Sequence, residues 1–168
     1  MAFVPINPIL GLPPIADFVD ASGADYVLPV PLGTIINATD PTYGAGEFIF
    51  LKGVASTVVG SAAVYNPDDF STTLGVADAI GPVAIAMSAC VAGKAGWYQI
   101  NGKGVAKAGT VADNASPYLT ATPGVLDDAV VAGDRVKGAK FASADGTPSA
   151  GLAEIELWRP YVDNAEAA

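Results

Sequence analysis

Alternation of large and small side chains with a period of two is the clearest pattern in this chain. It runs through residues 82–88, where three large apolar residues are separated by small ones, as in a strand whose two faces have different surroundings. A glycine-bearing turn at residues 93–96 follows, and then a second run of strand-favouring residues. The pattern predicts a central hairpin over residues 82–108.

The other candidate strands are short and bounded by Gly, Pro, Asn or Asp, the residues that favour turns. They are residues 34–37, 47–54, 62–65, 71–76, 116–120, 130–142 and 152–160. In the last one, even-numbered side chains would share one face and the apolar odd-numbered ones the other. Glycine or proline interrupts every longer helical pattern. The sequence therefore predicts an all-β fold, a compact β-barrel or sandwich of about eight to ten short antiparallel strands.

Residues 1–33 differ in composition from the rest of the chain. Their six prolines remove backbone donors, so neither a regular helix nor a central strand is expected. The segment is also too apolar for a solvated linker, and its cover is either its own β domain or another molecule. Its large apolar residues are Phe3, Val4, Ile6, Ile9, Leu10, Leu12, Ile15 and Phe18. We expect an extended Pro-rich N-terminal arm (1–33), a β domain (34–162) and a C-terminal tail (163–168).

Composition and charge narrow the class of protein. The 168 residues are enough for one domain, and a content of 51% hydrophobic and only 15% charged residues is typical of a subunit partly covered by partners. We therefore expect an oligomer or a component of an assembly. The net charge is −9, and residues 1–51 contain five acids and no Lys or Arg. The scattered basic residues form no stripe that would bind nucleic acid.

Membrane and secretory segments are not expected. The first ten residues lack the positive region that opens a signal peptide. The longest uncharged apolar run, residues 79–93, falls short of the roughly 20 residues that a membrane helix needs. The single cysteine, Cys90, lies in this run, and we expect a buried, inert thiol.

The candidates for chemistry are few because the chain contains no histidine, which removes Ser-His-Asp triads and imidazole zinc sites. Two acid pairs remain, Asp68-Asp69 and Asp127-Asp128. Both lie in turn-like sequence, and adjacent strand residues point to opposite faces. Residues 102–104, Gly-Lys-Gly, lack the spacing of a phosphate-binding loop and predict a turn between strands. We expect no catalytic, metal or cofactor site.

Four aromatic residues could serve either of two purposes. Exposed together, Trp97, Tyr98, Tyr118 and Trp158 could form a platform on which sugars stack. Large aromatic side chains more often dominate the burial of a core. We favour packing in the core.

Five segments within residues 44–162 form a recognisable set. They are GEFIFLKGVAS, GPVAIAMSA, GWYQINGKGVAKAG, ADNASPYLTATPG and VVAGDRVKGAKFAS, followed near the end by GLAEIELWRP. Together they resemble the small capsid-associated proteins of tailed bacteriophages, the head decoration or cement proteins. The shared motifs are structural, so the resemblance supplies no catalytic residues.

The resemblance implies a β domain, often trimeric, on the outside of the icosahedral shell, in contact with several copies of the major capsid protein. The chain would be a non-enzymatic structural protein of the virion, made in the host cytoplasm, that cements adjacent capsomers. The apolar arm residues from Phe3 to Phe18 would contact the capsid or a sister subunit. The alternative function is a head or tail fibre base, or a carbohydrate- or receptor-binding module.

Overall fold

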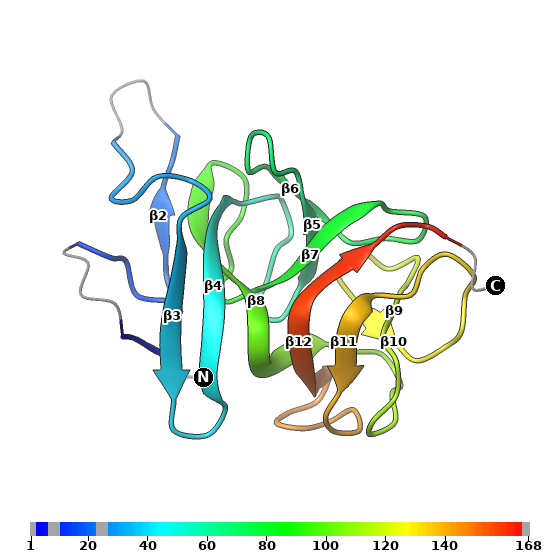
Figure 1. Ribbon diagram of the computed structural model, residues 1–168. Helices are drawn as coiled ribbons and strands as arrows, with labels where there is room; N and C mark the ends of the chain where they lie inside the picture. Colours follow the sequence, from blue (N-terminus) through cyan, green and yellow to red (C-terminus); the bar gives the residue numbers. More distant parts are fainter. Residues whose placement is uncertain (1–2, 7–10, 23–26, 166–168) are drawn as a thin grey trace.

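The computed structural model describes residues 3–6, 11–22 and 27–165 (Figure 1). The described residues form β-strands and no helix, and all pairings between strands are antiparallel. One large sheet is strongly curled, and a second, small sheet lies beside it (Figure 1). The prediction of an all-β fold is confirmed.

Twelve strands follow one another in the described part of the chain. The first six are β1 (Val4–Pro5), β2 (Phe18–Asp20), β3 (Ile35–Asp40), β4 (Gly44–Lys52), β5 (Ala62–Tyr65) and β6 (Thr72–Leu74). The other six are β7 (Gly81–Ala86), β8 (Lys94–Lys107), β9 (Tyr118–Leu119), β10 (Leu126–Asp127), β11 (Lys137–Phe141) and β12 (Leu152–Val162). The large sheet has the order β1-β3-β4-β8-β12-β7-β5-β6, with β11 beside β12 and β2 beside β8, whereas β9 and β10 form the small sheet.

Strand β8 is the centre of the sheet because it has partners along both edges. On one edge, β4 pairs with its residues 95–102. On the other edge β2, β7 and β12 follow one another at residues 94–96, 98–99 and 101–107. The two strands of the predicted hairpin therefore do pair, but over only two residue pairs. Most of the hydrogen bonding of β8 is with strands distant in sequence.

The turn predicted at residues 93–96 is displaced. Gly93 lies in the turn with a φ of +78°, but residues 94–96 already belong to β8 and pair with β2. Gly96 lies inside the strand, where a Cβ would make tight contacts of 3.2 Å with both the Cys90 sulfur and the Ser88 hydroxyl oxygen. This glycine permits close packing rather than a change of direction.

The turn predicted at residues 102–104 is wrong, because these residues lie inside β8. The register between β4 and β8 shifts at Ile100, which is the geometry of a β-bulge, and Gly102, two residues further on, has a φ of +93°. At Gly104, the amide of Gln99 fills the space that a side chain would need and donates hydrogen bonds to the carbonyls of Asn101 and Lys103. Strand β8 bends at this point and continues.

The sheet separates two apolar cores at β4 and β8. On one face, Phe50 and Trp97 pack with apolar residues from the N-terminal segment. On the other face, Leu51 and Tyr98 pack with residues of β5 and β7. A third core joins β11 and β12 to the small sheet. Phe3, Ile15 and Val30 of the N-terminal segment therefore belong to a core of the sheet.

Candidate functional site

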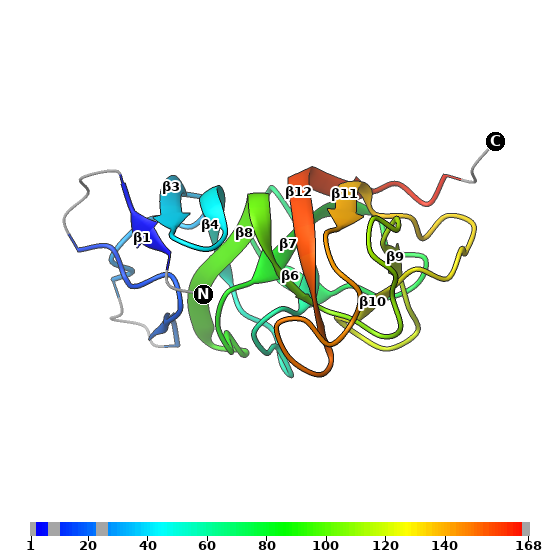
Figure 2. The ribbon, with the colours of Figure 1, turned by 90° about the horizontal axis from the view of Figure 1, so that it is seen from below.

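The described residues of the predicted arm lie on the sheet of their own chain. β1 pairs with β3, and β2 pairs with the first residues of β8. The indole Nε1 of Trp97 donates a 3.0 Å hydrogen bond to the carbonyl oxygen of Pro13. Figure 2 shows these segments at one end of the molecule, beside β3 and β4. They cover the face of the sheet that carries Phe50 and Trp97.

Three of the eight apolar residues predicted to contact a capsid or sister subunit pack inside their own chain. Phe3 and Ile15 are buried, and the ring of Phe3 lies 4.8 Å from the ring of Phe48 in an edge-on arrangement. Leu12 is half-buried against the same core. These three side chains stabilise the fold in this structure, since each removes apolar surface from water.

The remaining predicted contact residues divide into two groups. Ile9 and Leu10 lie outside the described residues. Val4, Ile6 and Phe18 are exposed, with 61%, 59% and 37% of their surface accessible. The structure therefore leaves these three available to a partner, and their contact with a capsid or sister subunit stays a prediction.

Val4 and Ile6 share one surface with a residue of the neighbouring strand. Val4 lies opposite Thr39, and the Ile6 amide donates to the carbonyl oxygen of Asn37, so both side chains project on the exposed face of β3. Ile35 follows on the same face and is 44% exposed. We name Val4, Ile6 and Ile35 the N-terminal apolar face.

The free edge of β1 is poorly suited to pairing with a further strand. The Ile6 amide bonds inward to β3, so the backbone of the preceding Pro5 faces the open edge. Proline has no N–H to donate to an added strand, which is a common way of blunting a sheet edge. A partner at this end would therefore meet side chains rather than extend the sheet.

The end of β2 is fixed by local polar contacts. The Asp20 carboxylate accepts hydrogen bonds from the backbone and hydroxyl of Ser22 and lies 3.0 Å from the ammonium of Lys94. The Ser22 hydrogen bonds, aided by Lys94, hold the pKa of this carboxyl well below its usual range. Because the pair is exposed, it contributes little to overall stability.

Three of the four carboxylates in the two candidate acid pairs hold turns and backbone, as their sequence indicates. Asp69 accepts hydrogen bonds from Ser71 and lies 3.8 Å from Lys52. Asp127 accepts from the amide of Ala129, although it lies in the short strand β10, and Asp128 accepts from the amide of Ala112. These carboxylates are engaged separately and do not converge on one cavity.

Cys90 and Tyr98 lie together in the core formed with residues of β4, β5 and β7. Burial raises the pKa of the Cys90 thiol to about 11. Burial also raises the pKa of the Tyr98 phenol well above its usual range. Both groups stay protonated at neutral pH. Cys90 is fully buried, so the expectation of a buried thiol is confirmed.

The four aromatic residues do not form a common platform. Trp97 and Tyr98 are fully buried on opposite faces of β8, whereas Trp158 on β12 is 55% exposed. Tyr118 is half-buried on β9. The preference for core packing is confirmed for the two adjacent residues of β8.

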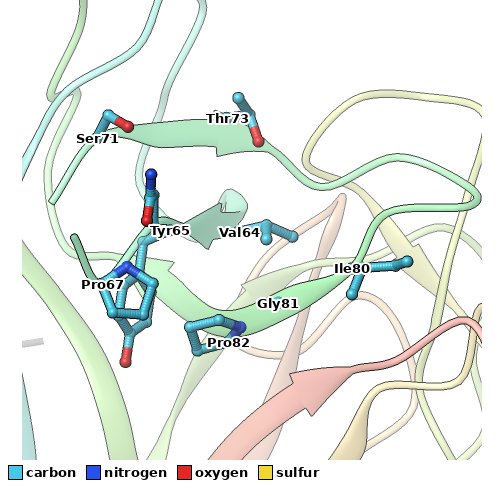
Figure 3. A pocket seen from close by; sticks show the side chains of 9 residues that line it. Val64, Tyr65, Pro67, Ser71, Thr73, Ile80, Gly81 and Pro82 are labelled. Atoms are coloured by element: carbon cyan, nitrogen blue, oxygen red, sulfur yellow. The ribbon is translucent and has the colours of Figure 1, made fainter. Parts of the chain in front are cut away.

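A hollow of about 270 Å³ lies between the β5–β6 hairpin and the start of β7. Figure 3 shows Ser71 and Thr73 along one side and Pro67 and Pro82 along the other, with Val64 between them. Its lining residues carry no charge, so the hollow suits an uncharged group. The sequence did not indicate it because the lining comes from three strands brought together by the fold.

The sequence matches no protein-family model and no curated protein. Among the described residues, no helix is long and apolar enough to cross a membrane. The same residues contain no group of three or more Cys, Asp or Glu side chains placed to hold a metal ion.

Proposed function

We propose that this protein is a non-enzymatic structural component of a tailed-bacteriophage head, which binds the outside of the capsid and links neighbouring capsomers. The observation that carries the proposal is the N-terminal apolar face, formed by Val4, Ile6 and Ile35 on adjacent strands at the edge of the sheet. Grouped apolar side chains on a surface favour contact with another protein. The resemblance of residues 44–162 to decoration proteins supplies the class of partner, the major capsid protein.

Each contact made by this face would be modest in free energy. Full burial of an apolar side chain of this size contributes about 1.5–3 kcal/mol relative to full exposure, and all three side chains are already partly buried. The protein would act through multivalency, because many weak links on one shell raise the effective concentration of neighbouring capsomers. Such links stabilise a shell without any catalytic chemistry.

The test is binding to undecorated capsids assembled from the major capsid protein of the same virus. The variant Val4→Asp/Ile6→Asp places charge on the N-terminal apolar face without touching the core, and Val59→Asp is the matched control. Val59 is similarly exposed on the connection between β4 and β5. Deletion of residues 2–30 is a poor test, because Phe3, Ile15 and Val30 belong to the core.

We expect the wild type and Val59→Asp to sediment with the capsids and the double variant to bind at least about tenfold more weakly, since one charge buried without a partner costs more than 1.4 kcal/mol. Matching thermal melting curves would show that all three proteins are folded. Equal capsid occupancy by the wild type and the double variant would remove this face from the proposal.

A further inference from the structure

A second hollow, of about 370 Å³, lies at the end of the molecule that carries β9 and β11. We name it the β11 pocket; its main lining residues are Tyr118, Val130, Val131, Ala132, Arg135 and Lys137. Val130 is 81% exposed and Val131 is 46% exposed, so two adjacent apolar side chains face solvent at its rim. A pocket of this size can receive one or two side chains.

Among the described residues, no ion pair neutralises the Arg135 cation in the β11 pocket. Six ion pairs in the described part of the chain each join one Lys or Arg to an acid, and none of them includes Arg135. The Arg135 guanidinium donates a 3.2 Å hydrogen bond to the Ser116 hydroxyl. Lys137, by contrast, is bound to Asp163 at 2.6 Å. The pocket therefore combines apolar walls with a cation that lacks a carboxylate partner among the described residues.

The complementary chemistry lies at the opposite end of the same molecule. Residues 1–51 contain no Lys or Arg. Asp17 is exposed, takes part in none of the described ion pairs and directly precedes Phe18, which is 37% exposed and whose ring centroid lies 5.9 Å from the Lys94 ammonium. One of its oxygens accepts a 2.8 Å hydrogen bond from the Phe18 amide, and the other makes no hydrogen bond to the described residues. Figure 1 shows β2 and the β9–β11 region at opposite ends of the molecule.

We propose that the protein associates head to tail with a second copy of itself, with Asp17 and Phe18 of one copy docked in the β11 pocket of the next. The carboxylate would pair with Arg135 while the ring packs on Val130 and Val131. A guanidinium and a carboxylate form a strong, directional pair once water is excluded. Contact between two β11 pockets would instead bring two Arg135 cations together, which is unfavourable.

A head-to-tail contact repeats from copy to copy and closes into a ring when the rotation between copies allows it. The inference deepens the proposed function by supplying the contact between sister subunits. It is tested on the purified chain without capsids, so its failure and the failure of capsid binding are separate results. The N-terminal apolar face lies on β1 and β3, whereas Asp17 and Phe18 lie at β2, so the two contacts use different strands.

The first experiment measures self-association of the full chain by sedimentation velocity over a range of concentrations. Arg135→Glu and Asp17→Arg should each weaken association about tenfold or more, and the double variant Asp17→Arg/Arg135→Glu should restore it, because the pair is re-formed with reversed charges. Lys107→Glu is the control, since it makes the same charge change at a lysine outside the pocket and outside the described ion pairs. A wild type that stays monomeric at all concentrations, or a double variant as weak as the single ones, would overturn the proposal.

The second experiment tests the polarity of the contact. Val131→Asp disables the pocket and Phe18→Asp disables the docking end, and both changes are at partly exposed positions. Each variant alone should be monomeric, whereas an equal mixture should form a complex of two chains, because it contains one intact pocket and one intact docking end. A mixture that stays monomeric, or a Val131→Asp variant that associates like the wild type, would contradict head-to-tail docking.

Discussion

At the scale of single residues, Trp97 shows how the N-terminal segment is joined to the sheet. Its ring lies 5.0 Å from that of Phe50, and its Nε1 donates to the Pro13 carbonyl. One fully buried side chain thus satisfies its polar group on the segment that covers it, as buried Trp normally must. Its burial could be predicted from a strand-like sequence, but the acceptor 84 positions away could not.

The buried Cys90 thiol should make the free energy of unfolding fall as the pH rises above 9. Its pKa is raised from 9.0 to about 11 in the folded state because of burial. Below pH 9 the thiol is protonated in both folded and unfolded chains, so it has no effect on the pH dependence. Between pH 9 and about 11 only the unfolded chain loses the proton, so the free energy of unfolding falls, by at most roughly 1.4 kcal/mol per pH unit.

The measurement is urea unfolding at a series of pH values from 7 to 11, and we expect the Cys90→Ala variant to lose less stability than the wild type above pH 9. The comparison reports on the thiol together with Tyr98, because the pKa of that phenol is raised by burial and also by the neighbouring Cys90. Parallel pH profiles for the two proteins would show that the thiol ionises as readily in the folded chain as in the unfolded one.

At the scale of elements, Gly102, two residues beyond the bulge in β8, lets this strand lie close against β4. Gly102 combines a φ of +93° with a backbone contact so close that a Cβ would collide with the carbonyl oxygen of Ala45. Gly146 has a similar φ of +90° but open space around it. Alanine substitutions at these two positions therefore separate the free-energy cost of the backbone conformation from that of the steric collision.

We expect Gly102→Ala to lower the free energy of unfolding by more than Gly146→Ala, which should cost about 1 kcal/mol from backbone strain alone. The additional loss at Gly102 arises because the neighbouring strand β4 must move away. Chemical unfolding of both variants under the same conditions gives the comparison. Equal losses would mean that the bulge can relax without disturbing the β4–β8 pairing.

The elements that the sequence predicts well are those with enough residues to show a period. Strand β12 alternates as expected, with Ala153, Ile155 and Leu157 buried, and β5 has the predicted bounds. β1, β2 and β10 are two or three residues long, which is too short for a periodic pattern. The glycines of β8 misled the prediction because the same residue type serves turns and bulges.

The candidate surfaces were predictable only in part. Composition indicates that the apolar N-terminal residues must be covered, but it does not say which of them turn inward, as Phe3 and Ile15 do, and which outward, as Val4 does. The β11 pocket had no signal in the sequence, because it joins Tyr118 to a distant loop and strand. Such surfaces depend on long-range contacts that no local pattern records.

At the scale of the whole molecule, the described surface offers different chemistry at its two ends. The N-terminal end carries an apolar face and an exposed carboxylate, and the opposite end carries an apolar pocket with an arginine. Figure 2 shows the same separation of β1 and β3 from β9 and β10 in a second view. In the proposed assembly, the N-terminal apolar face of each copy would meet the capsid. The β2 end of one copy would dock in the β11 pocket of the next.

The most direct test of capsid binding is an image of purified virions by electron cryomicroscopy, at a resolution that places individual strands. We expect density for this chain on the outside of the shell, with β1 and β3 turned toward the major capsid protein and Val4 and Ile6 at the contact. Particles that lack the chain, or a bound chain whose β1 and β3 face solvent, would contradict it.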